Sequence, residues 1–212
     1  LATFGAPTQR GQSSPATQET YYLANSIYYN SYWGYQEGEK RNSRVVKSFD
    51  PTLIFSHDFK IDQNQQIKTG AAFHYSMYSN SALTFFNAPD PRPDYYRNLP
   101  SFQYDGQVGL DGNINGNPNQ DMINELTNAW HKRDPLYTQI SWDSLYQANY
   151  RNNLANPTGN AKYALERRHN DLMETALNSV YTNQFNRYLK ITAGIDAKYS
   201  KGIHYKTMDD LL

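Results

Sequence analysis

The sequence contains no cysteine. This absence excludes disulfide bonds and thiolate chemistry, and it leaves only histidines and carboxylates as protein ligands for zinc. The 5 histidines are scattered, and none has the paired spacing of a metal site on a helix. Basic and acidic residues balance at 20 each, so no excess of positive charge is present to attract nucleic acid. We therefore expect no metal, no cofactor and no nucleic-acid partner.

Long apolar runs are also missing. No run reaches the ~18–20 residues that a membrane helix needs, the aliphatic residues are sparse, and the mean hydropathy is −0.84. Aromatic residues are abundant instead, with 19 Tyr, 9 Phe and 3 Trp. Many tyrosines with few aliphatics favour half-exposed strands with aromatic side chains at a boundary, as in transmembrane β-barrels.

A period-two alternation predicts a β-hairpin over residues 45–86, with its turn at 62–66. Pro51 is an objection to the first arm, because proline cannot donate a hydrogen bond to a neighbouring strand. The odd positions of both arms are mostly apolar and form one face: Phe49, Leu53, Phe55, Phe59, Ile67, Ala71, Phe73 and Met77.

A second hairpin is predicted over residues 161–206, with its turn at 183–187. Its second arm alternates most clearly, with Ile191, Ala193 and Ile195 on the odd face. Residues 1–6 indicate the end of a strand. The stretches 7–44 and 87–160 are predicted to be long loops, the latter with a short helix near residues 121–132. Loops this long are unusual in a compact soluble domain and ordinary on the outer side of a large barrel.

These patterns predict an all-β fold in which antiparallel hairpins form part of a transmembrane barrel. The alternative is a soluble β-sandwich in which the same aromatic residues cap the core. In the barrel interpretation the odd rows face lipid and the even rows face the lumen. The charged even positions that we expect to line the lumen are Lys68, His74, Lys190, Asp196 and Lys198.

The loops supply the candidate binding residues. Exposed aromatic rings stack on sugars, peptides or partner proteins, whereas the alternative is that they pack the loops against each other. The candidates are Tyr32, Trp33, Tyr35, Tyr95, Tyr96, Trp130, Trp142 and Tyr146.

Catalytic signatures are missing from the sequence. It has no nucleophile elbow, phosphate-binding glycine loop or supported carboxylate pair, so we expect no enzyme. Asp111, Asn113 and Asn115 match the first half of a calcium loop, but Met122 stands where a bidentate glutamate belongs. An Asn/Gly-rich surface turn is the favoured interpretation of that stretch. Calcium binding, with Asp121 as a further ligand, stays open as the alternative.

Several motifs carry a family resemblance. Phe4 to Gln12, Tyr32-Trp33-Gly34-Tyr35-Gln36, Asn87 to Tyr96 and the closing Tyr199-Ser200-Lys201-Gly202 resemble barrel sequence of the TonB-dependent outer-membrane receptors of the Bacteroidota, the SusC-like type. The resemblance covers most of the chain. It implies a barrel of about 22 strands around a plug domain, located in the outer membrane of a Gram-negative bacterium.

The same resemblance implies an importer of a nutrient such as a glycan, a peptide or a metal chelate. It further implies energy coupling through TonB, and contact with lipid, a surface lipoprotein or other outer-membrane proteins. No plug or TonB-binding segment is visible in the 212 residues, and both ends look like cuts through a larger protein. Two alternatives stay open: a barrel scaffold that does not transport, and a soluble β-rich carbohydrate-binding module.

Overall fold

A computed structural model describes residues 1–105, 119–157 and 159–212. Most of these residues lie in antiparallel strands, and the chain divides into two units. Unit 1 comprises Leu1–Arg10, Val46–Asn80 and Arg167–Thr207, and unit 2 comprises Gly11–Val45, Ser81–Glu166 and Met208–Leu212. Several strands begin in one unit and end in the other.

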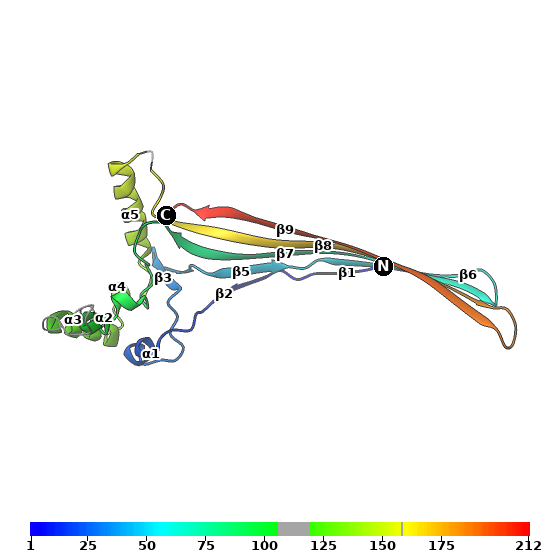
Figure 1. Cartoon of the computed structure of the whole chain (residues 1–212), viewed down its shortest axis with the longest axis horizontal. Coiled ribbons are helices and arrows are strands. Elements are labelled where there is room, and N and C mark those ends of the chain that lie inside the picture. The colour runs from blue at the N-terminus through cyan, green and yellow to red at the C-terminus, as the bar shows by residue number, and fades with distance from the viewer. Residues whose placement is uncertain (106–118, 158) are drawn as a thin grey trace, which may run out of the picture. The chain divides into compact units, whose positions relative to one another are not determined.

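Unit 1 is a single antiparallel sheet, and no helix of the described residues belongs to it (Figure 1). Its strands are β1 (Ala2–Phe4), β2 (Thr8–Gly11), β5 (Val45–Phe49), β6 (Thr52–Lys60), β7 (Gln65–Phe85), β8 (Tyr163–Gln184) and β9 (Lys190–Asp210). β7 pairs with β5 and β6 on one side and with β8 on the other, and β8 pairs with β9. One edge of the sheet is formed by β1, which pairs with β6, and β2, which pairs with β5. The other edge is β9.

Strands β5 and β6 are in effect one strand with a two-residue interruption. Phe49 pairs with Met77 and Thr52 pairs with His74, so the register continues across Asp50 and Pro51 without a bulge. The proline cannot donate to the neighbouring strand, but its carbonyl accepts a hydrogen bond from the Tyr75 amide at 3.1 Å. Pro51 therefore interrupts the ladder without shifting the alternation of faces.

The predicted hairpins need small corrections at their turns. The first turn occupies residues 61–64, because Gln65 and Gln66 already belong to β7 rather than to the predicted turn at 62–66. The second turn lies at residues 185–189, two residues later than 183–187, and β9 extends to Asp210. Both predictions placed the turn where polar residues cluster, whereas the paired backbone runs on through part of each cluster.

Unit 2 contains all the described helices, in stretches predicted as loops. They are α1 (Gln18–Ala24), η1 (Tyr96–Asn98), α2 (Phe102–Asp105), α3 (Gln120–His131), α4 (Pro135–Thr138) and α5 (Trp142–Ala155). The prediction of a helix near residues 121–132 is confirmed by α3. The stretch 7–44 also contains β2 and a hairpin of β3 (Trp33–Gln36) with β4 (Glu39–Asn42), so describing it as a loop was wrong.

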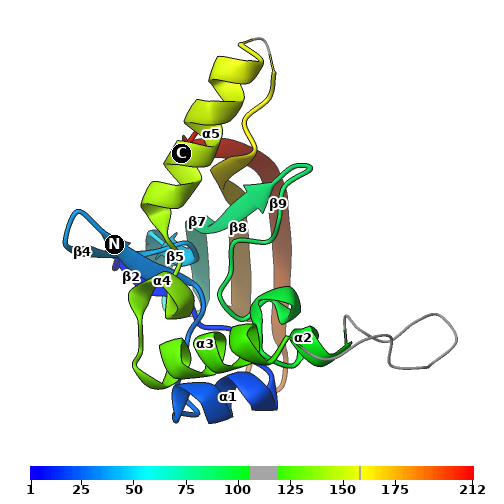
Figure 2. The same ribbon diagram turned by 90° about the vertical axis from the view of Figure 1, so that its left-hand side faces the viewer.

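Two small apolar clusters hold unit 2 together. In the first, Leu23 of α1 packs with Leu99 and Trp130 of α3, and α1 lies beside α3 in Figure 2. The second joins buried residues of α5, of the segment before it and of β8: Ile140, Trp142, Leu145 and Tyr163, together with Leu212. Unit 2 is therefore a packed assembly of short elements rather than a set of irregular loops.

Candidate functional site

One face of unit 1 is apolar and uncovered within the unit. Cross-strand partners keep odd residues on one face, since Leu53 pairs with Phe73 and Phe59 pairs with Ile67. The exposed fraction is 51% for Phe59 and 71% for Ile195. Other large apolar side chains exposed at odd positions of the unit are Leu53, Phe55, Phe73, Met77, Leu177, Ile191 and Tyr199. An uncovered apolar face of this extent indicates contact with lipid or with another protein.

The opposite face carries a network of charged and polar side chains. His74 lies 3.9 Å from Asp50 and 3.7 Å from Glu174, and Glu174 in turn binds Lys198 at 2.7 Å. Asp58 pairs with Lys68 at 3.7 Å. The linked contacts run from Asp50, between β5 and β6, to Lys198 of β9, and the Asp58–Lys68 pair is separate from them. These charged groups therefore have partners inside the sheet.

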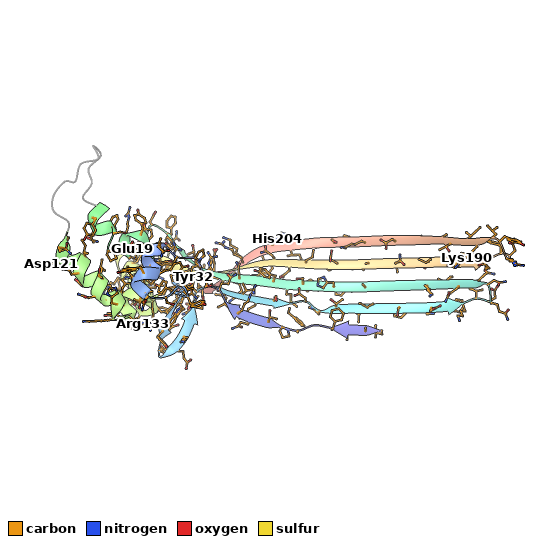
Figure 3. All side chains as sticks on the ribbon, turned by 90° about the horizontal axis from the view of Figure 1, so that it is seen from below. Glu19, Tyr32, Asp121, Arg133, Lys190 and His204 are labelled. Atoms are coloured by element: carbon orange, nitrogen blue, oxygen red, sulfur yellow. The ribbon has the colours of Figure 1, made fainter. Side chains whose placement is uncertain are left out.

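The predicted lumen residues share this face. His74 and Lys198 both contact Glu174, Lys68 pairs with Asp58, and Asp196 accepts a hydrogen bond from Asn178 at 3.3 Å. Lys190 stands at the first position of β9, next to the turn (Figure 3). Whether this face lines a lumen stays a prediction.

Aromatic and polar residues lie at both ends of the apolar face. Phe185 and Tyr188 are exposed at the turn between β8 and β9. Near the other end, the rings of His169 and Tyr205 stack at 4.3 Å, beside a cavity of about 410 Å³ that Phe49, Met77 and Lys47 also line. Rings with polar edges at both ends of an apolar band are typical of the two interfaces of a membrane.

Two of the predicted loop aromatics are core residues. Trp130 is 1% exposed and Trp142 is 0% exposed, and each lies inside one of the two clusters of unit 2. Both rings are packed inside unit 2 rather than exposed on a loop surface, so the packing alternative describes them. Their helical neighbourhood explains the burial, because α3 turns an apolar side inward and the start of α5 packs Trp142 and Leu145 into the second cluster.

The remaining loop aromatics lie at the surface of unit 2. Tyr35 and Tyr96 are exposed, whereas Tyr32, Trp33, Tyr95 and Tyr146 are half-buried. They do not gather into one site. Instead they form separate contacts: Trp33 with Tyr35 at 5.5 Å, Tyr95 with Tyr96 at 4.7 Å, and Arg44 over Tyr32 at 5.1 Å.

Tyr146 belongs to a network around Arg41. The Arg41 guanidinium lies 4.2 Å above the Trp142 ring and donates to Asp210 at 2.7 Å and to the Tyr146 hydroxyl at 3.1 Å. Burial alone would lower the pKa of Arg41, but these hydrogen bonds raise it above its usual value. Burial alone would raise the pKa of Asp210, but the hydrogen bonds from Tyr146 and Arg41 outweigh this effect. The pKa of Asp210 therefore falls below its usual value. This ion pair joins β4 to the end of β9.

A cavity beside Trp130 was not predicted from the sequence. It measures about 370 Å³, and its wall includes Tyr28, Tyr29, Trp33, Trp130 and Arg133. These residues come from the segment after α1, from β3 and from the end of α3. The signal was hidden because the residues are distant along the chain and only the helical packing brings them together.

The described part of the chain contains no group of three residues suited to hold a metal ion. Asp111, Asn113 and Asn115, the candidate calcium ligands, lie outside the described residues. None of the helices in residues 1–105, 119–157 and 159–212 is long and apolar enough to cross a membrane.

Comparisons with known proteins identify no relative. No protein-family model matches the chain, and none of the curated proteins matches it. Function therefore has to be inferred from geometry and chemistry.

Proposed function

We propose that unit 1 is part of the wall of an outer-membrane β-barrel, and that the protein is a TonB-dependent transporter that imports a nutrient. The observation that carries the proposal is the single antiparallel layer with one uncovered apolar face and one polar, internally paired face. A soluble β-sandwich would cover its apolar face with a second sheet, and unit 1 has no second layer among the described residues.

Strand length supports the proposal. β7 and β9 have 21 residues each, which is about twice the 9–11 residues that span a bilayer when tilted. From Ile191 to Tyr199 the odd positions of β9 are all apolar or aromatic. They cover ~26 Å along the strand at ~3.3 Å per residue, or ~20 Å across the membrane at a tilt near 40°. The remaining residues of each strand project beyond the membrane.

The sheet edges define what the proposal requires. β9 pairs only with β8 among the described strands, so its other edge carries unpaired backbone groups. Unpaired backbone groups in lipid cost several kcal/mol each. Further strands outside this sequence must pair with both edges and close the barrel, for which the resemblance implies about 22 strands.

Transport is supported by the resemblance and by the polar face. In the proposal Lys68, His74, Asp196 and Lys198 line the lumen around a plug, and the long loops of unit 2 face the outside and contact substrate or a surface lipoprotein. TonB would supply energy through the plug. A barrel scaffold that does not transport would share the wall, and it would differ by lacking TonB-dependent uptake.

Arginine substitutions on the two faces test the wall. Ile195→Arg should block assembly into the outer membrane, because an arginine facing lipid near the midplane costs about 2–4 kcal/mol. Thr192→Arg, on the opposite face of the same strand, should assemble. The amount of heat-stable, folded protein in outer-membrane fractions measures both variants, and equal tolerance of the two would contradict the orientation.

A further inference from the structure

Arg133 stands out in unit 2 because its charge is not used within the fold. In the part of the chain that the structure describes, no hydrogen bond, ion pair or ring contact involves its side chain. The adjacent carboxylate of Asp134 is engaged elsewhere, since it caps α4 by accepting from the Leu136 amide at 3.0 Å. Arg133 lies at the surface of unit 2 (Figure 3).

The backbone at Arg133 is unusual for an arginine. Its φ angle is +56°, and its amide donates to the Trp130 carbonyl at 2.9 Å, which closes the C-terminal end of α3. Glycine is the common residue at such a position, because a side chain there is strained. Strained residues cluster at binding sites, where the strain is part of the function.

Two cavities adjoin at this residue. The first is the cavity beside Trp130, with aromatic walls from Tyr28, Tyr29 and Trp33. The second, also about 370 Å³, is lined by Tyr22 and His131 and shares Ala24 and Arg133 with the first. The described walls of both cavities contain no aspartate or glutamate, and Arg133 is the one residue with a permanent charge in them.

We propose that the cavity beside Trp130 binds a ligand that carries both a carboxylate and a ring. The guanidinium of Arg133 matches a carboxylate with two parallel hydrogen bonds, and the aromatic walls accept the flat face of a sugar or phenyl ring. The volume lies within the range of small-ligand sites. The inference deepens the proposed function and rests on it only in placing unit 2 outside the cell.

The carboxylate can come from an acidic sugar or from an aromatic amino acid at the end of a peptide. The full-length protein, purified in detergent, is titrated with trigalacturonate and with its methyl ester, and with N-acetyl-phenylalanine and its amide. We expect one of the acids to bind and its neutral partner to bind at least tenfold more weakly. Which acid binds identifies the source of the carboxylate.

Substitutions tie binding to Arg133. Arg133→Gln should weaken binding of that acid about tenfold or more, and Arg133→Lys should weaken it less, because lysine keeps the charge without the planar fork. Lys132→Gln is the matched control, an exposed cation next in sequence that lines neither cavity, and it should bind like the parent.

The proposal is overturned if neither acid binds better than its neutral partner, or if Arg133→Gln binds as the parent does. Equal losses in Arg133→Gln and Lys132→Gln would also overturn it. Folded barrel in the outer membrane is verified before any titration, so a failure here is separate from a failure of the proposed transporter.

Discussion

Asp94 carries a carboxylate that unit 2 holds partly away from water. Its Oδ1 is buried and has no hydrogen-bond partner among the described residues. Burial raises the pKa of this carboxyl above its ordinary 3.8, and the nearby Ser31 hydroxyl and Arg92 guanidinium offset part of the rise. The charged form of Asp94 therefore opposes folding of unit 2.

This raised pKa gives unit 2 a pH dependence of known sign. The folded state binds more protons than the unfolded state above pH 3.8, so stability should fall as the pH rises from there through the raised pKa. Asp94→Asn should remove that fall and stabilise unit 2 at neutral pH. Hydrogen exchange in peptides around residues 89–105, corrected for the pH dependence of intrinsic exchange rates, measures the stability of unit 2 at each pH.

The control for this substitution is Asp121→Asn, which removes the same charge from an exposed position at the start of α3. This substitution should leave the fall in unit 2 stability with rising pH unchanged. An Asp94→Asn protein whose unit 2 loses as much stability from pH 4 to pH 7 as the parent does would contradict the assignment to Asp94.

At the scale of elements, Asn149 joins α5 to the start of β8. Its side-chain amide donates to the carbonyls of Tyr163, Leu211 and Leu212, and its oxygen accepts from the amides of Lys162 and Tyr163 at 2.7 and 3.0 Å. One buried side chain therefore satisfies the backbone of two strand ends.

Asn149→Ala should destabilise unit 2 by about 3 kcal/mol or more, because it leaves several buried backbone groups without partners. Asn152→Ala, on the same helix, removes one exposed hydrogen bond to Asn160 and should cost about 1 kcal/mol or less. Hydrogen exchange of α5 compares the two variants, and equal protection in both would show that Asn149 is not the link.

Gly34 joins the β3–β4 hairpin to the segment before α5. The Ile140 amide donates to the Trp33 carbonyl at 3.0 Å, and a Cβ on Gly34 would lie 1.9 Å from the Ile140 carbonyl oxygen. Only a residue without a side chain permits this approach of two backbones.

Gly34→Ala should therefore separate Ile140 from the hairpin and cost about 3 kcal/mol, within the range for overpacked sites. Gly70→Ala in β7 is the matched control, because a Cβ there meets nothing within 4 Å. Protease cleavage within residues 137–160 reports the separation. If both variants resist the protease equally, the close approach does not hold the segment.

The sequence predicts the sheet better than it predicts the loops, for a physical reason. Period-two alternation along β6, β7 and β9 follows directly from one apolar and one polar face, so strands and faces could be read from Phe55, Phe73 or Ile195. The helices α1 and α5 bury few residues each, and their polar, aromatic sequences show no clear helical period. The start of α4 could have been predicted from Asp134-Pro135, because an N-cap aspartate followed by proline at the first helical position is typical of a helix start.

The candidate sites divide in the same way. Charged even positions such as Lys68 and Lys198 could be placed on one face from alternation alone. The burial of Trp130 and Trp142 could not be predicted, because it depends on the packing of short helices from distant parts of the chain. The cavity at Arg133 depends on the same packing, and its backbone angle leaves no trace in the sequence.

At the scale of the whole molecule, the central claim is that unit 1 forms part of a closed wall in the outer membrane. An open sheet with these apolar side chains exposed would aggregate in water. In a closed barrel the apolar face contacts lipid and the polar face contacts water. The claim concerns the full-length protein, because the proposal requires further strands to pair with the edges of unit 1.

The most direct measurement is fractionation of cells that express the full-length protein, followed by gel electrophoresis of unheated and boiled samples. The barrel predicts that the protein is found with the outer membrane and migrates differently before and after boiling, because a closed barrel resists detergent until it is heated. A freely soluble protein with no heat-dependent shift would contradict the barrel and favour a soluble binding module.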